Sequence, residues 1–153
     1  MKCFFEEKND IEGYHESLLS LKKILEPKTF NFMLNESLHD SVINNITTVN
    51  NYDENKHNTG KDSIVSVSAH LKHWNEHEHE LLWENVTVYL LDFDISRNKI
   101  AESNQILFDR GLDEWSHDEL LLIKDSYLRH EMFLFSQTTI IIECSKFSIN
   151  QID

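Results

Sequence analysis

Apolar and polar residues alternate along the central part of the chain. In Ser63–Lys72 one parity is apolar and the other carries Ser, His and Lys side chains. The apolar parity consists of Val65, Val67, Ala69 and Leu71. Period-two alternation is typical of a half-buried antiparallel strand. The segment Leu81–Leu91 follows a short charged turn and is rich in β-branched and aromatic residues, so the two segments predict a hairpin.

Other stretches show the same period. Strands are predicted at Val42–Val49, Tyr127–Phe135 and Thr138–Ile149. The segment Glu114–Ile123 fits a strand or a helix, and its pattern leaves both open. In the last strand the apolar residues change parity at Ser145, and a β-bulge near this residue would bring them all to one face.

Helical spacing is confined to the beginning of the chain. Tyr14, Leu18, Leu21 and Leu25 form one stripe, and Pro27 ends this helix and can begin the next. Helices are therefore predicted at about 9–26 and 28–36. Helices followed by a run of strands indicate an α+β fold in which the helices pack on a mainly antiparallel sheet of about six strands. The length fits one domain, 1–153.

Charge narrows the classes of partner. The chain has a net charge of −13 at pH 7, and so acidic a surface repels nucleic acid and anionic membranes. It suits a basic protein partner, or simply keeps the chain dissolved. The start lacks the apolar core of a signal peptide and no apolar run is long enough to span a bilayer, so a cytoplasmic location is expected. Cys144 is predicted to be a buried free thiol, with a Cys3–Cys144 disulfide as the alternative.

Histidines crowd into the turn between the two central strands. His73, His77 and His79, with a neighbouring glutamate, could ligate zinc. The alternative is an exposed turn that its charges keep hydrated. The same turn carries a candidate surface for a protein partner, formed by Trp74, Glu76, Glu78 and Glu80. The other two tryptophans, Trp83 and Trp115, are predicted to lie in the core.

Further acid–base pairs lie outside this turn. His39 and Asp40 stand where the helices give way to strands, and they form either a structural bend or a ligand pair. His117 and His130 would complete a site if they met His39 in space. His130 also fits a hydrogen-bonded core residue, because its strand face is otherwise apolar. Nucleophile elbows and glycine-rich phosphate loops are absent from the sequence, so we expect neither a catalytic residue nor a cofactor.

One pattern resembles a known group of proteins. Pro27–Leu34 leads into Leu38-His39-Asp40-Ser41-Val42-Ile43, strand pairs follow, and the chain continues with Glu114-Trp115 and Tyr127-Leu128-Arg129-His130-Glu131. This arrangement resembles small uncharacterised bacterial proteins with a Leu-His-Asp strand opening, which are similar to polymorphic-toxin immunity proteins. The resemblance implies no catalytic residues.

Three hypotheses follow. The first is a non-enzymatic acidic binding protein of the immunity type that neutralises a basic protein. The second is a metal-binding protein or metal-dependent hydrolase that uses the histidine cluster. The third is a homodimer formed through an exposed strand edge.

Overall fold

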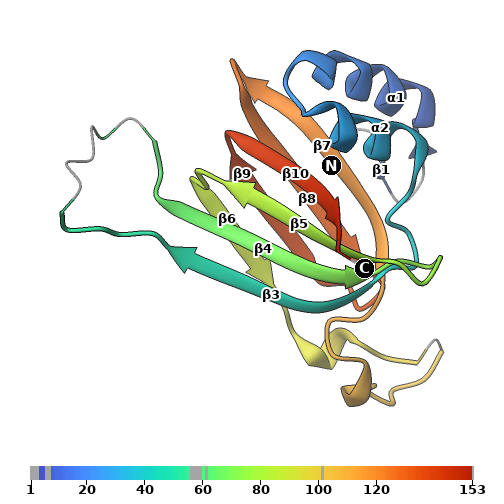
Figure 1. The fold of residues 1–153 in the computed structure, drawn as a ribbon. Helices are drawn as coiled ribbons and strands as arrows, with labels where there is room; N and C mark the ends of the chain where they lie inside the picture. Colours follow the sequence, from blue (N-terminus) through green and yellow to red (C-terminus); the bar gives the residue numbers. More distant parts are fainter. Residues whose placement is uncertain (1–3, 6–7, 56–59, 61, 101, 153) are drawn as a thin grey trace.

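The computed structural model describes residues 4–5, 8–55, 60, 62–100 and 102–152, and Cys3 lies outside them. Two helices are followed by two four-stranded antiparallel sheets (Figure 1). The helical part comprises α1 (Ile11–Ser20), a 3-10 turn (Leu21–Lys23) and α2 (Pro27–Asn35). The first sheet has the order β10-β5-β4-β3 and the second the order β6-β9-β8-β7. The two-residue strands β1 (Phe4–Phe5) and β2 (Lys8–Asn9) form a separate pair.

The strands of the two sheets follow the predicted segments closely. The first sheet contains β3 (Val42–Asn50), β4 (Val65–Lys72), β5 (Glu78–Glu84) and β10 (Lys146–Gln151). The second contains β6 (Val88–Asp92), β7 (Trp115–Lys124), β8 (Tyr127–Leu134) and β9 (Thr139–Cys144). The segment that the sequence left open at Glu114–Ile123 is therefore the strand β7. Short 3-10 turns at Ile95–Arg97 and Phe108–Arg110 lie between β6 and β7.

The prediction of one sheet with about six strands was wrong in the number of strands and sheets. Two of the predicted strands each bend and contribute to both sheets. One gives β5 and β6 on either side of Asn85–Thr87, and the other gives β9 and β10 on either side of Ser145. The β-bulge expected near Ser145 is instead a break between two strands, and it has the expected effect on burial: Phe147 and Ile149 are buried, as are Ile140, Ile142 and Cys144.

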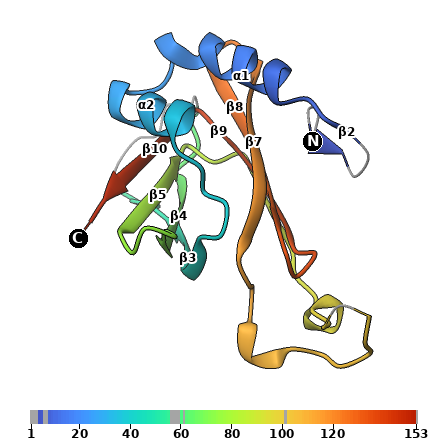
Figure 2. The same cartoon turned by 90° about the vertical axis from the view of Figure 1, so that its right-hand side faces the viewer.

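The helices close one end of the two sheets. Asp10 begins α1, where its carboxylate accepts a hydrogen bond from the Gly13 N–H at 2.9 Å. The first helix is shorter than the predicted 9–26, because its last turns are the 3-10 turn. Pro27 is the first residue of α2, one residue before the predicted range, because proline needs no hydrogen bond to its nitrogen there. Figure 2 shows α1 above β7 and β8, and α2 above β10 and β5. The described part of the chain contains no helix that is long and apolar enough to cross a membrane.

The main core lies between the two sheets and under the helices. The largest fully buried side chains include Trp83, Trp115 and Phe147, so the core positions predicted for two tryptophans are confirmed. Trp83 stacks on Phe147 with ring centroids 5.4 Å apart. Leu21 and Leu71 are also fully buried and bring the helical end and β4 into the same core.

Cys144 is a buried free thiol, as the sequence predicted. Burial raises the pKa of this thiol to about 12, because the thiolate would lose its hydration. With Cys3 replaced by serine, we expect a thiol reagent at pH 8 to modify the folded chain at least ~100-fold more slowly than the unfolded chain. Absorbance after addition of Ellman's reagent, with and without urea, measures both rates. Equal rates would contradict the burial of Cys144.

Candidate functional site

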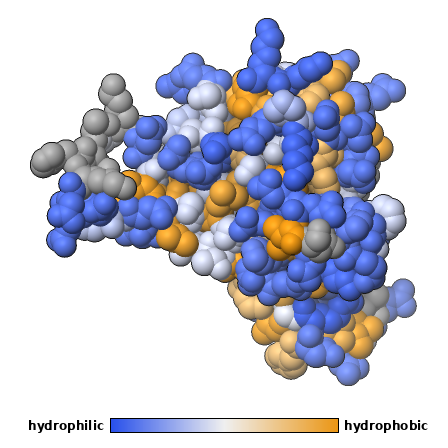
Figure 3. All heavy atoms as spheres, in the orientation of Figure 1, coloured by the Kyte–Doolittle hydropathy of each residue, from blue (hydrophilic) through white to orange (hydrophobic). Residues whose placement is uncertain are grey.

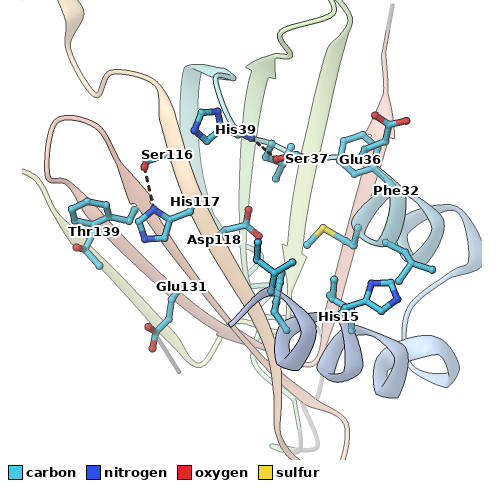
Figure 4. A pocket seen from close by; sticks show the side chains of 17 residues that line it. His15, Phe32, Glu36, Ser37, His39, Ser116, His117, Asp118, Glu131 and Thr139 are labelled. Atoms are coloured by element: carbon cyan, nitrogen blue, oxygen red, sulfur yellow. Dashed lines mark hydrogen bonds between the residues drawn. The ribbon is translucent and has the colours of Figure 1, made fainter. Parts of the chain in front are cut away.

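A pocket of about 870 Å³ surrounds the strand β7 near its start, between the helices and the second sheet. Its apolar wall comes mainly from α1 and α2, and its polar side chains come mostly from β7, β8 and the segment after α2, with His15 from α1 and Thr139 from β9. In Figure 4 His117 and Glu131 lie on one side of β7, whereas Asp118, Phe32 and His15 lie on the other. The edge strand therefore separates the pocket into two parts.

Two of the three predicted histidines reach this pocket. His39 and His117 both line it, and His130 lies behind it, hydrogen-bonded to the lining residue Asp118. The three residues therefore gather in one region, but His130 is fully buried in the described structure and does not line the pocket.

His130 belongs to a hydrogen-bonded network that joins the two sheets. The Trp83 Nε1–H donates to His130 Nδ1 at 3.2 Å, and His130 Nε2 lies 2.9 Å from Asp118 Oδ2. The Trp115 Nε1–H donates to the other carboxylate oxygen of Asp118 at 3.0 Å. Because Nδ1 of His130 accepts a hydrogen bond, the proton of the neutral ring is on Nε2 and points to Asp118.

His117 lies at a different kind of position. Burial lowers its pKa, because the charged ring would be poorly hydrated, and the neighbouring His39 acts in the same direction while Asp118 opposes it. The Ser116 hydroxyl lies 3.0 Å from His117 Nδ1, and the ring packs on Phe133. An acid–base relay through His117 and Asp118 is disfavoured, because Asp118 lies on the opposite side of β7 and accepts hydrogen bonds from Trp115 and His130.

His39 and Asp40 form a local pair at the bend before β3. Asp40 has a positive φ of 62°, and its N–H donates to the carbonyl of Trp115 at 2.9 Å. His39 Nδ1 lies 3.0 Å from Asp40 Oδ1, and about half of each side chain is exposed. This geometry agrees with the structural bend that the sequence offered as one alternative.

The histidines of the β4–β5 turn do not share one environment. His73 and His79 are buried next to Phe32 of α2, and their ring centroids are 5.4 Å apart. His77 is exposed, and its Nδ1 lies 3.2 Å from the Gln151 amide. No group of three or more His, Cys, Asp or Glu residues is positioned for a metal ion in the parts of the chain that the structure describes. The metal role of these three histidines therefore stays a prediction without geometric support.

The predicted partner surface is at the tip of the same turn. Trp74 is 62% exposed, and Glu76 and Glu78 are exposed next to it. Glu76 forms an ion pair with Lys72, and Glu80 lies 3.4 Å from His70 on the outer face of the first sheet. The four residues thus belong to one end of the β4–β5 hairpin, which we call the acidic turn (Trp74, Glu76, Glu78 and Glu80).

The sequence did not predict the network around His130. Its members are far apart in the chain, and nothing in their local pattern pairs them. One signal was present. A buried Trp or His needs a hydrogen-bond partner, and Asp118 lies on the same strand face as the apolar residue Leu120. Comparison with protein-family models, curated proteins and solved structures finds no match to this chain, so the resemblance to immunity proteins stays an expectation.

Proposed function

We propose that this chain is a non-enzymatic binding protein that holds a basic protein partner on its acidic turn. The exposed Trp74, in a turn that also carries Glu76 and Glu78 as exposed residues, is the observation that carries this proposal. Tryptophan and arginine dominate the binding energy of many interfaces, and an indole face attracts Lys and Arg side chains.

The indole of Trp74 rests on a rigid support. Its ring centroid is 5.3 Å from that of His73, which is buried. The Nε2–H of His73 donates to the Ser37 carbonyl at 2.7 Å, and its backbone N–H donates to the His77 carbonyl at 2.8 Å. A side chain that is already held in place loses little conformational entropy when a partner binds.

The charge around Trp74 favours a cationic partner. The Lys72 ammonium forms an ion pair with Glu76 and lies in the field of Glu78, Glu80 lies beside His70, and the whole chain carries −13. Figure 3 shows many hydrophilic residues over β3 and β4, but these two strands carry no Asp or Glu, so the carboxylates near Trp74 are those of the acidic turn itself. Acidic surfaces of this kind accelerate association with basic proteins and weaken in salt. Together with the resemblance to immunity proteins, this charge supports the neutralisation of a basic toxin as the biological role.

The environment of the buried histidines also favours binding over chemistry. Both ring nitrogens of His130 are engaged, with Trp83 in the core and with Asp118 at the pocket wall, and the His130 side chain is shut off from solvent. The His73 Nε2–H donates a hydrogen bond to the backbone carbonyl of Ser37, in the segment after α2. Side chains held in this way stabilise the fold and cannot approach a substrate without breaking it.

The proposal can be tested without knowing the natural partner. Selection of a phage library of random peptides on the immobilised chain is expected to enrich Lys- and Arg-containing sequences. Trp74→Ala is expected to lower the affinity of the chain for the selected synthetic peptides at least ~30-fold, the loss typical of a central anchor residue. Glu78→Gln should slow association and reduce its salt dependence. Isothermal titration calorimetry and stopped-flow fluorescence measure these effects.

Matched substitutions elsewhere on the surface distinguish binding at the acidic turn from attraction by the overall negative charge. Tyr52→Ala removes another exposed aromatic side chain, and Glu16→Gln removes another exposed carboxylate. Both should leave the peptide affinity within about twofold. If the selected peptides are not basic, or if Trp74→Ala and Tyr52→Ala have equal effects, the proposal is wrong.

A further inference from the structure

The edges of the two sheets differ in how they are protected. Exposed edges present unpaired backbone groups, and proteins usually cover them or interrupt them. At β10 the helix α2 packs on the strand, and the Thr29 hydroxyl accepts a hydrogen bond from the Ile149 N–H at 3.2 Å. At β7 the Tyr14 hydroxyl of α1 accepts one from the Leu120 N–H, also at 3.2 Å. Helical side chains therefore satisfy a backbone group on each of these two edges.

The β3 edge is protected differently. Its register with β4 shifts between Ile43 and Asn45, and such an irregularity twists an edge away from further pairing. The side chains that follow on this strand are mostly Asn and Thr, and they are exposed. A bulged, polar edge is a poor template for another strand.

The β6 edge lacks these devices. It pairs with β9 in an uninterrupted register from Val88 to Asp92, and no strand lies on its other side among the described residues. The strand contains no Lys, Pro or Gly. Val88, Leu90 and Leu91 are 38%, 47% and 41% exposed, which is a large apolar surface for five residues. The edge therefore has both the unpaired backbone and the apolar side chains that favour pairing with another strand.

We propose that β6 pairs with β6 of a second copy of this chain, antiparallel about a two-fold axis through Leu90. In this register Leu90 lies opposite its own counterpart and Tyr89 lies opposite Leu91. The central pairs are thus apolar, and the two sheets join into one sheet that continues across the axis. A second copy fits the edge because antiparallel self-pairing matches apolar or aromatic residues at the three central positions, while Val88 lies opposite Asp92 at each end.

Charges at the end of the strand permit this pairing. The Arg97 guanidinium donates to both carboxylate oxygens of Asp92 at 3.0 Å, and these hydrogen bonds lower the pKa of Asp92. The Asp94 carboxylate accepts hydrogen bonds from the backbone and hydroxyl of Ser96. The acids closest to the edge are therefore already engaged within one chain. The remaining repulsion comes from the net charge of −13 on each copy, and salt screens such repulsion.

Sedimentation of the purified chain tests the proposal directly. We expect a reversible monomer–dimer equilibrium that strengthens at least ~3-fold when NaCl rises from about 50 to about 500 mM, because like charges are screened. Binding of a basic peptide to the acidic turn has the opposite salt dependence, so the two proposals can fail separately. Leu90→Lys places a charge on the exposed edge and should abolish the dimer. Thr47→Lys, the same change on the exposed β3 edge, should not.

Cross-linking tests the register. Across an antiparallel pair opposing Cα atoms are about 4.5–5.5 Å apart, which a disulfide can span. Leu90→Cys is therefore expected to form a covalent dimer under mild oxidation. Thr47→Cys should form no more covalent dimer than the parent chain does. A chain that remains monomeric at every concentration and salt, or a Leu90→Lys variant that associates as well as the parent, would overturn the proposal.

Discussion

Replacing Asp118 with alanine is expected to lower the free energy of unfolding by about 2–4 kcal/mol. The change leaves two buried N–H donors without their acceptor, those of Trp115 and His130, at a cost of about 1–3 kcal/mol each. The Asp118 side chain is 12% exposed, so water in the pocket recovers part of this loss. Urea denaturation followed by tryptophan fluorescence measures the effect, since two of the three indoles belong to the network.

A matched aspartate provides the control for this prediction. Asp109 is exposed on a 3-10 turn, and Asp109→Ala should change the free energy of unfolding by less than about 0.5 kcal/mol. Nitrogen chemical shifts of His130 should also report a neutral ring protonated on Nε2 in the parent chain. Equal stability of the two alanine variants would mean that Asp118 does not anchor the network.

Phe147→Ala is expected to destabilise the chain by about 3–5 kcal/mol, as is usual for a large aromatic side chain removed from a core. Phe147 is 2% exposed, stacks on Trp83 and meets the edge of His130 with ring centroids 5.0 Å apart. It reaches this position only because the chain bends at Ser145. The substitution therefore tests the bend as well as the core.

Two variants calibrate the Phe147 experiment. Phe147→Leu keeps most of the volume and should lose no more than about half as much stability as the alanine variant. The Ile152 side chain is 45% exposed, so Ile152→Ala should change the free energy of unfolding by less than about 0.5 kcal/mol. Guanidinium denaturation with an unchanged slope would show that only stability has altered. A loss below about 1 kcal/mol for Phe147→Ala would place the ring outside the core.

Sequence reasoning succeeded where the information was local. Alternation in Ser63–Lys72 located β4, Pro27 marked the start of α2 to within one residue, and the change of parity after Cys144 indicated an irregularity where β9 ends and β10 begins. The alternation of apolar and polar residues does not indicate, however, how many sheets the strands form. A strand that bends keeps its pattern on both sides of the bend, so one predicted strand, Leu81–Leu91, became β5 and β6.

The candidate sites show the same division. Exposure of Trp74 was predictable because it stands among charged residues in a turn. The separation of the three turn histidines was not, because Phe32 of α2 covers His73 and His79 and leaves His77 in solvent. Helix α2 is about forty residues earlier in the chain, and no local spacing indicates that it packs there.

By itself the sequence determined the order of helices before strands, the position of most strands, the acidic character and the exposed indole of this protein, since each depends on neighbouring residues and on composition. Only the tertiary structure decided that the strands form two sheets, that Asp118 and His130 join two tryptophans, and that β6 keeps a bare apolar edge. These features arise from contacts between residues far apart in the chain. Such contacts are selected by the packing of the whole core, which a local pattern does not encode.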